Sequence, residues 1–285
     1  MNLRTTRRSF LESAGAAGLG TLALSPASAA IEPAPYGIKL GIATYTFRNF
    51  DRAKVIEMLK ELHVTWISIK NTPQQLPLNA SPAETAAARK QFDDAGFKVS
   101  SAGNIDMTKA KTVEDLRPIF EWAKTARLPM LVCAPTHDNI RAVEAMVKEY
   151  NIRIAIHNHG PEDKHFPTPQ SVLEAVRPLD PRCGLCMDIG HTERAGADPV
   201  KAIPEAGDRL FEMHSKDLAN FESRESQVDV GDGIIPIPQI FRQLHKIDFQ
   251  GCVNLEYEIH PDNPMPGVQR SLSYMRGVLA GLASA

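Results

Sequence analysis

The chain has 285 residues, with 32 Lys and Arg against 34 Asp and Glu, which gives a formal net charge of −2. This balance, with no basic block beyond the N-terminal region, argues against a nucleic-acid-binding surface, because such a surface needs a basic patch. Without an N-terminal signal, the length suits one large α/β domain of about 250 residues, the size typical of β/α barrels.

The N-terminal segment has the pattern of an export signal. Residues 6–11 (TRRSFL) contain twin arginines, residues 14–24 are weakly apolar and rich in Gly and Ala, and residues 27–29 (ASA) form a small-residue cleavage site. This order is typical of a Tat-type signal peptide, and the apolar stretch is shorter than the ~20 residues of a membrane span. We therefore expect removal of residues 1–29 on export through the Tat translocase. Residues 30–285 would then form one periplasmic domain without stable membrane insertion.

Eight short apolar runs, each expected to be a strand, follow in chain order and alternate with helical patterns. The runs cover residues 40–46, 66–70, 98–102, 130–134, 152–157, 184–188, 210–214 and 252–256. Amphipathic patterns between them predict helices, several of which begin with N-capping residues such as Ser81 and Thr112. The alternation, at intervals of roughly 25 to 30 residues, predicts a (β/α)8 TIM barrel. The alternative, a doubly wound open sheet, lacks support because no Gly-rich dinucleotide-binding loop follows the first run.

All four cysteines lie within apolar runs: Cys133, Cys183, Cys186 and Cys252. Cys183 and Cys186 form a C-x-x-C pattern, which in some contexts indicates a redox pair or a zinc site. On one strand, however, residues three apart point to opposite faces. Buried core thiols are therefore the favoured interpretation.

Polar side chains stand where four of the predicted strands end. They are His157 and His159, Asp188 and His191, His214 and Lys216, and finally Glu256, with Glu258 as its alternative. The carboxyl ends of parallel strands converge on one mouth when a barrel closes. Imidazoles and carboxylates gathered there suit a divalent metal ion. Asp188 has a second interpretation, as the N-cap of the next helix.

These motifs resemble the xylose isomerase-like TIM barrels, the sugar phosphate isomerase/epimerase superfamily, over essentially all of the mature chain. The resemblance is strongest in residues 157–162, 186–199, 208–217, 230–233 and 251–258. It implies a divalent metal ion held by four residues, which by position are His157, Asp188, His214 and Glu256. Many members have Glu where this chain has His157, so His159 is the alternative ligand. Two imidazoles suit Mn, Co, Zn or Fe better than Mg.

The resemblance and the residues together predict an isomerase or epimerase that removes the proton α to a carbonyl of a sugar or keto-sugar, through a metal-stabilised enediolate. Candidate acids and bases are His159, Glu162 and Lys216, and candidate substrate-binding residues are Lys70 and His191. Loss of a β-hydroxyl or alkoxide would instead make the enzyme a lyase, dehydratase or hydratase, for example on 3-keto-glycosides. A non-catalytic sugar-binding barrel and an endonuclease-like phosphodiesterase are further alternatives. The expected ligand is a small, unphosphorylated carbohydrate, and homo-oligomer formation stays open.

Overall fold

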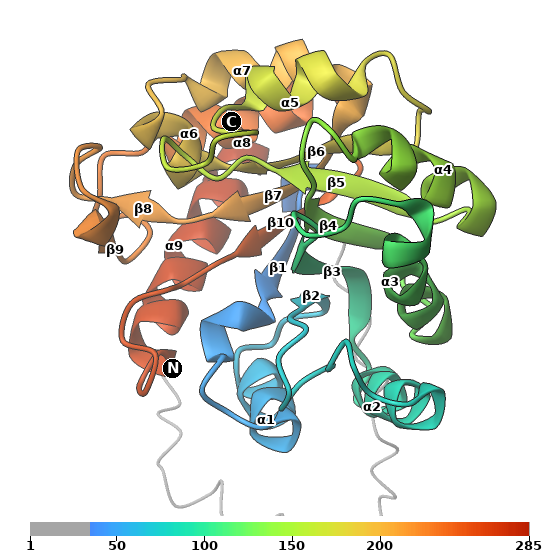
Figure 1. Ribbon diagram of the computed structural model, residues 1–285. Coiled ribbons are helices and arrows are strands. Elements are labelled where there is room, and N and C mark those ends of the chain that lie inside the picture. Colours follow the sequence, from blue (N-terminus) through green and yellow to red (C-terminus); the bar gives the residue numbers. More distant parts are fainter. Residues whose placement is uncertain (1–34, 285) are drawn as a thin grey trace, which may run out of the picture. The chain divides into compact units, whose positions relative to one another are not determined.

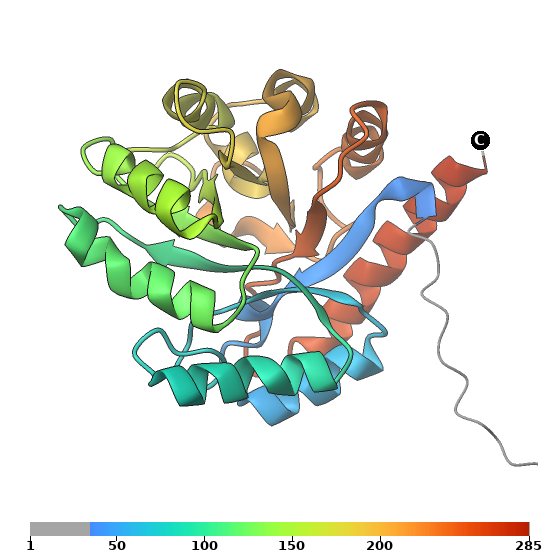
Figure 2. The ribbon, with the colours of Figure 1, turned by 90° about the vertical axis from the view of Figure 1, so that its right-hand side faces the viewer.

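Eight parallel strands form a closed barrel in the order β1-β10-β7-β6-β5-β4-β3-β2, and helices surround it (Figures 1 and 2). The computed structural model describes residues 35–284. The barrel strands are β1 (Lys39–Ala43), β2 (Trp66–Ile69), β3 (Lys98–Asp106), β4 (Met130–Ala134), β5 (Arg153–His157), β6 (Cys183–Asp188), β7 (Leu210–Ser215) and β10 (Cys252–Leu255). Each predicted run overlaps one of these strands, so the (β/α)8 prediction is confirmed.

The helices pack their apolar stripes onto the outside of the barrel. They are α1 (Arg52–Glu61), α2 (Pro82–Asp94), α3 (Val113–Thr125), α4 (Ile140–Tyr150), α5 (Pro169–Val176), α6 (Ile189–Arg194), α7 (Pro199–Ala206), α8 (Ile237–Lys246) and α9 (Met265–Ala283). In α8 the helical spacing of Ile237, Ile240, Phe241 and Leu244 buries all four side chains. Each such side chain stabilises the fold by about 1.5–3 kcal/mol.

The N-capping residues predicted from sequence begin their helices as expected. The Ser81 and Thr112 side chains each accept a hydrogen bond from the backbone N–H three residues later, and the Glu84 and Asp115 carboxylates accept one from the backbone N–H of the capping residue. These reciprocal capping boxes satisfy donors that a helix N-terminus otherwise leaves unpaired. They fix where α2 and α3 begin.

Two segments differ from the prediction. The end of the first run, residues 44–46, belongs to a short 3-10 helix, Thr44–Phe47, because Gln75 Nε2 donates to the carbonyls of Thr44 and Phe47 and turns the chain away from the sheet. The predicted loop 219–238 contains part of an antiparallel ribbon formed by β8 (Asp217–Leu218) and β9 (Gln227–Val228). This ribbon lies beside the carboxyl end of β7.

The cysteines are free and buried, as predicted. Cys183 belongs to the large core between strands and helices, whereas Cys186 packs with Met130, Val132 and Ala155 in a separate apolar group. Neighbouring inward-facing positions of a barrel fill its interior in layers. Cys183 and Cys186 therefore point to opposite faces of β6, which argues against a redox pair.

The expected signal peptide, residues 1–29, lies outside the described residues, so Tat export and a periplasmic location stay predictions. Within residues 35–284, none of the helices is both long enough and apolar enough to span a membrane.

Asp217 fastens the segment that follows the β8–β9 ribbon. Its Oδ2 accepts backbone hydrogen bonds from Gly231 (2.9 Å) and Gly233 (3.2 Å), and its Oδ1 accepts from Ile235 (3.0 Å) and Leu218 (2.9 Å). Gly231 has φ +105°, and a Cβ at position 233 would lie 2.2 Å from Asp217 Oδ1. Glycine is therefore required at both positions, which accounts for the Val-Gly-Asp-Gly motif at residues 230–233.

Replacing Asp217 with Ala should destabilise the protein by about 2–4 kcal/mol, because four backbone donors lose a buried charged acceptor. Urea unfolding of a chain of residues 30–285 measures this, with Asp208→Ala, which removes an exposed carboxylate, as the control. Equal unfolding midpoints for the two variants would show that the hydrogen bonds to Asp217 contribute no stability.

Candidate metal centre

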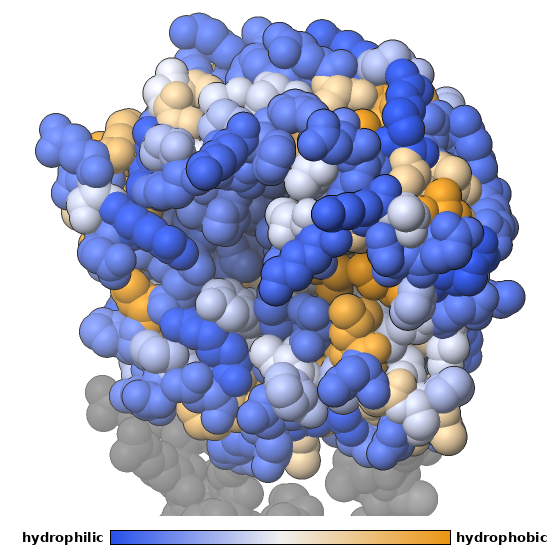
Figure 3. Space-filling model, viewed as in Figure 1, coloured by the Kyte–Doolittle hydropathy of each residue, from blue (hydrophilic) through white to orange (hydrophobic). Residues whose placement is uncertain are grey.

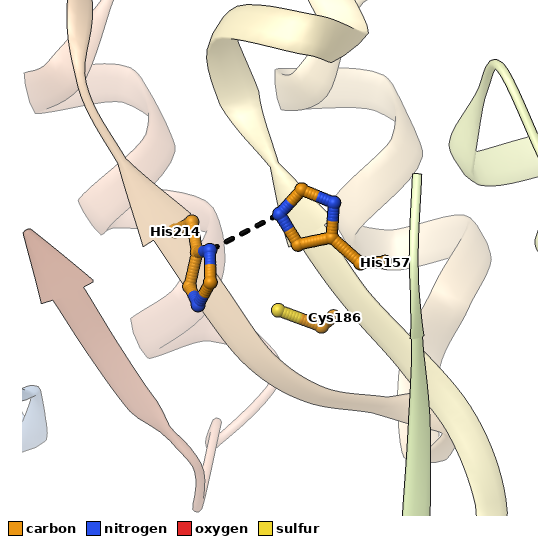
Figure 4. A group of neighbouring side chains, drawn as sticks. All are labelled: His157, Cys186 and His214. Carbon is orange, nitrogen blue, oxygen red and sulfur yellow. Dashed lines mark hydrogen bonds between the residues drawn. The ribbon is translucent and has the colours of Figure 1, made fainter. Parts of the chain in front are cut away.

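Four strand-end side chains meet at the carboxyl ends of the barrel strands. We call them the mouth cluster: His157 (β5), Asp188 (β6), His214 (β7) and Glu256 (directly after β10). One potential ligand atom from each lies within 4.8 Å of the others. His157 Nε2 is 3.1 Å from His214 Nδ1 and 3.7 Å from Asp188 Oδ2. His214 Nδ1 is also 3.2 Å from Glu256 Oε2. Figure 4 shows the two imidazoles facing each other from β5 and β7, the strands on either side of β6.

The mouth cluster is buried, and several of its polar atoms make no hydrogen bond within the protein. None of the four residues is more than 8% exposed. His157 Nδ1, Asp188 Oδ2 and His214 Nε2 make no hydrogen bond. Buried polar atoms are rarely left unpaired, and two imidazoles with two carboxylates form a donor set that suits zinc and similar divalent ions. The residues present therefore fit a divalent metal ion.

The two imidazoles have opposite pKa shifts. Burial, followed by the effect of the neighbouring His214, holds the pKa of His157 well below its ordinary value. Burial also acts to lower the pKa of His214, but the acidic groups around it, Cys186 and Glu256 first, raise it well above its ordinary value. The pair thus holds positive charge on one ring and a neutral acceptor on the other. The same acidic surroundings would favour the binding of a cation.

Lys216 lies beside the mouth cluster among three carboxylates. Its Nζ is 3.0 Å from Asp188 Oδ2, 3.1 Å from Glu256 Oε2 and 2.5 Å from Glu258 Oε2. Burial opposes its charge, yet these carboxylates raise the pKa of Lys216 well above its ordinary value. A Cβ at Gly190 would lie 2.8 Å from Lys216 Cγ and Cδ, so glycine leaves the space that the lysine occupies. Lys216 is therefore a cation held in place by its neighbours. Both Glu256 and Glu258 contact it, but only Glu256 belongs to the mouth cluster.

Asp188 both caps a helix and faces the mouth cluster. Its Oδ1 accepts from the backbone N–H of His191 at 2.8 Å, which caps α6, while Oδ2 faces His157. Asn158 holds the backbone of Asp188: its Oδ1 accepts from Asp188 N at 3.0 Å and its Nδ2 donates to Asp188 O at 3.3 Å. The two interpretations of Asp188 are compatible because each uses a different oxygen.

His159 and His191 extend the histidine group beyond the mouth cluster. The His159 ring centroid is 5.4 Å from that of His157 and 4.6 Å from that of His191. Burial lowers the pKa of His191 to about 4, so this ring is neutral at neutral pH. The group of close ligand atoms includes His157 and does not include His159.

Glu162 and Lys70 lie outside the close group. The Glu162 side chain is 50% exposed and forms an ion pair with Arg194, which lowers the pKa of its carboxyl. Lys70 Nζ donates to the backbone oxygen of Asn104 at 3.0 Å, and burial lowers its pKa although nearby carboxylates oppose the shift. The structure therefore places Glu162 in an ion pair near the surface and Lys70 in a half-buried position.

A cavity of about 240 Å³ opens beside Lys216, and its lining includes Tyr45, Arg48, His191, Lys216, Gln227 and Glu258. Figure 3 shows a hollow among hydrophilic side chains near the β8–β9 ribbon. Most of these side chains donate or accept hydrogen bonds, and Tyr45 adds an aromatic ring. Such a lining suits a small molecule with several polar groups.

The sequence analysis missed Glu212, below the mouth cluster, and predicted Cys186 only as a buried core thiol. Glu212, two residues before His214 on β7, is fully buried and accepts a hydrogen bond from Ser101 Oγ at 2.6 Å. Cys186, two residues before Asp188, offers a thiol close to both cluster histidines (Figure 4). Burial raises the pKa of this thiol to about 11. Alternation along a strand was the missed signal, because a residue two positions before an inward-facing one also faces inward.

Two curated relatives are inosose dehydratases. The protein from Geobacillus kaustophilus (strain HTA426) is 25% identical in an alignment that covers 44% of this chain and 45% of the relative, so this chain spans less than half of that protein's length. The protein from Bacillus thuringiensis (strain Al Hakam) is 23% identical, and the alignment covers 76% of each chain.

Solved structures share the fold. The IOLI protein with a bound zinc atom matches with a TM-score of 0.71 at 18% identity, covering 86% of this chain and 99% of that one. A D-psicose 3-epimerase in the presence of D-fructose matches with a TM-score of 0.69 at 16% identity, covering 86% and 100%. The sequence pattern of the xylose isomerase-like TIM barrel family matches residues 46–278, which is most of the chain. The chain therefore belongs to the xylose isomerase-like TIM barrel family.

Proposed function

We propose that this protein is a divalent-metal-dependent lyase of the dehydratase type, which acts next to the carbonyl of a keto-sugar or cyclic keto-polyol. The observation that carries the proposal is the mouth cluster itself, four buried donor atoms within 4.8 Å of one another beside Lys216. The names of the curated relatives, both inosose dehydratases, support elimination of water.

The mouth cluster would hold the metal ion through His157 Nε2, Asp188 Oδ2, His214 Nδ1 and Glu256 Oε2. When bound, the metal supplies a Lewis acid that stabilises negative charge on the substrate oxygens. The metal species stays open among zinc, iron, manganese and cobalt, since all of them accept imidazole and carboxylate ligands.

Side chains of the protein would bind the substrate and transfer the proton. Lys216, a buried cation that three carboxylates hold in place, donates a hydrogen bond to a substrate oxygen and is too firmly protonated to act as a base. His159, beside the cluster and half-buried, is our preferred proton-transfer group. Glu162 has a lowered pKa and an arginine partner, and both weaken it as a base.

His157 supports elimination over epimerisation. Epimerisation at one carbon needs proton-transfer groups on both faces of the substrate, whereas elimination needs one base and one acid for the leaving oxygen. A carboxylate ligand keeps a second oxygen for proton transfer, but the second nitrogen of His157, Nδ1, is buried without a partner. An isomerase or epimerase remains the second candidate, favoured by the fold shared with the D-psicose 3-epimerase.

The substrate class follows from the cavity and from the expected export. The lining combines hydrogen-bonding side chains with the Tyr45 ring, an arrangement that suits a polyhydroxylated ring. A periplasmic enzyme meets few phosphorylated sugars, so we propose an unphosphorylated carbohydrate.

Removing one ligand should remove the metal. His214→Gln and Asp188→Asn should each reduce bound zinc from one ion per chain to a small fraction after dialysis, as measured by elemental analysis. His137→Gln, an exposed histidine outside the cluster, is the control. Full zinc content in both cluster variants would rule out the mouth cluster as the metal site.

Solvent deuterium should report the reaction. We expect that the metal-loaded protein, incubated with a panel of keto-sugars and inososes in deuterated water, exchanges the α-proton and releases an unsaturated product. NMR detects both events. Exchange with inverted configuration and no elimination would select the epimerase, and turnover that depends on added NAD without exchange would contradict proton abstraction altogether.

His159→Asn should lower kcat by about 10²- to 10⁴-fold, the usual contribution of a general acid or base. Bound zinc should stay at the level of the unaltered protein. Glu162→Gln, which alters the rival candidate, should have a much smaller effect on kcat. The reverse order of the two effects would assign proton transfer to Glu162.

A further inference from the structure

A buried carboxylate lies next to the mouth cluster and has no part in the proposed chemistry. Glu212 on β7 is 0% exposed, and its Oε1 is 3.8 Å from His214 Nε2. Ser101 Oγ donates to the same oxygen at 2.6 Å, and Ser68 Oγ is hydrogen-bonded to Ser101 Oγ at 2.7 Å. A carboxylate buried this deeply is costly unless a donor or a charge stabilises it. The two serines satisfy only one of its oxygens.

Two buried atoms at this point lack hydrogen bonds, His214 Nε2 and Glu212 Oε2. The 3.8 Å between the imidazole and the carboxylate exceeds hydrogen-bonding distance, so the groups are neighbours without being bonded. His214 turns its other nitrogen, Nδ1, to His157 and Glu256. If Nδ1 binds a metal, the neutral ring carries its proton on Nε2, and that N–H needs an acceptor on the Glu212 side.

We propose that Glu212 is a positioning residue of the metal centre: its carboxylate accepts the Nε2–H of His214 and fixes the tautomer that presents Nδ1 to the metal ion. For that hydrogen bond to form, the two groups must approach from 3.8 Å to hydrogen-bonding distance. Ser101 and Ser68 hold the carboxylate in place from β3 and β2. Carboxylate partners of this kind orient a histidine ligand and raise its basicity, and their loss typically weakens metal binding 10- to 100-fold.

Cys186 is the rival acceptor. Its thiol lies close to both cluster histidines, as Figure 4 shows, and it is equally buried. Thiol sulfur is a weak acceptor, whereas a carboxylate forms short, strong bonds with a polarised N–H. The inference therefore assigns the role to Glu212, and a Cys186→Ala variant separates the two.

The first measurement is zinc affinity of the mature protein, determined with a competing chelator. Glu212→Ala should weaken zinc binding 10- to 100-fold, and Glu212→Gln, which keeps an acceptor oxygen without the charge, should fall between Ala and the unaltered protein. Glu144→Gln, a buried carboxylate on α4 away from the cluster, controls for the loss of a buried acid. If the Glu212 variants fail to fold, Ser101→Ala is the substitute. It removes the hydrogen bond that holds the Glu212 carboxylate, and it should also weaken zinc binding.

The second measurement distinguishes positioning from simple support of the fold. In zinc-bound protein labelled with ¹⁵N-histidine, NMR should show the Nε2–H tautomer of His214 with a downfield, slowly exchanging proton. This signal should be lost in Glu212→Ala and kept in Cys186→Ala.

The inference rests on the proposed metal centre but not on the reaction, and the outcomes separate the two. Equal zinc affinity and an unchanged His214 signal in Glu212→Ala would overturn the role of Glu212 while leaving the centre intact. Loss of the signal in Cys186→Ala alone would transfer the role to the thiol. An unaltered protein that binds no zinc or other divalent metal would overturn the proposed function together with this inference.

Discussion

The burial of negative charge at the carboxyl ends of the barrel strands is the constraint on which this site depends. Asp188, Glu256 and Glu258 face one ammonium group, that of Lys216, and of these residues only Glu258 is not buried. Isolated buried carboxylates are unstable, so the surrounding residues must supply positive charge and hydrogen-bond donors. Lys216 supplies part of this compensation and the protonated imidazole of His214 supplies another part. A divalent ion among the same donors would complete it.

The register of the parallel strands places the side chains of the site in successive layers of the barrel interior. Asp188 pairs with His214 across β6 and β7, and His157 pairs with Cys186 across β5 and β6. The mouth cluster therefore occupies the outer layer of the barrel interior, and Glu212 and Cys186 lie one inward-facing position earlier on their strands. Interior layers of such barrels usually consist of branched apolar side chains, so polar residues at this depth indicate a role in supporting the layer above.

The sequence contained the strand pattern and the residues of the mouth cluster, because both follow from local spacing and from the convergence of parallel strands. It favoured His157 over His159 as the ligand only through the family resemblance, since alternation turns both to the same side. The contact between His157 and His214 separates the two histidines in three dimensions. Glu162 is near His159 in sequence, yet Gly160, with φ +83°, turns the chain so that Glu162 meets Arg194 near the surface. Long-range pairs of this kind leave no local pattern.

The same balance of charges links metal binding to the stability of the fold. A ligand that binds only the folded protein stabilises it in proportion to the logarithm of its concentration over its dissociation constant. Here the folded state also concentrates acidic groups that an unfolded chain would expose to water. A cation bound by the mouth cluster would therefore relieve repulsion that folding itself creates. Glu212 adds a further buried carboxylate below His214, and a proton on the facing nitrogen of the His214 ring would help to stabilise it. This carboxylate is thus the group best placed to keep Nδ1 of His214 free for a metal.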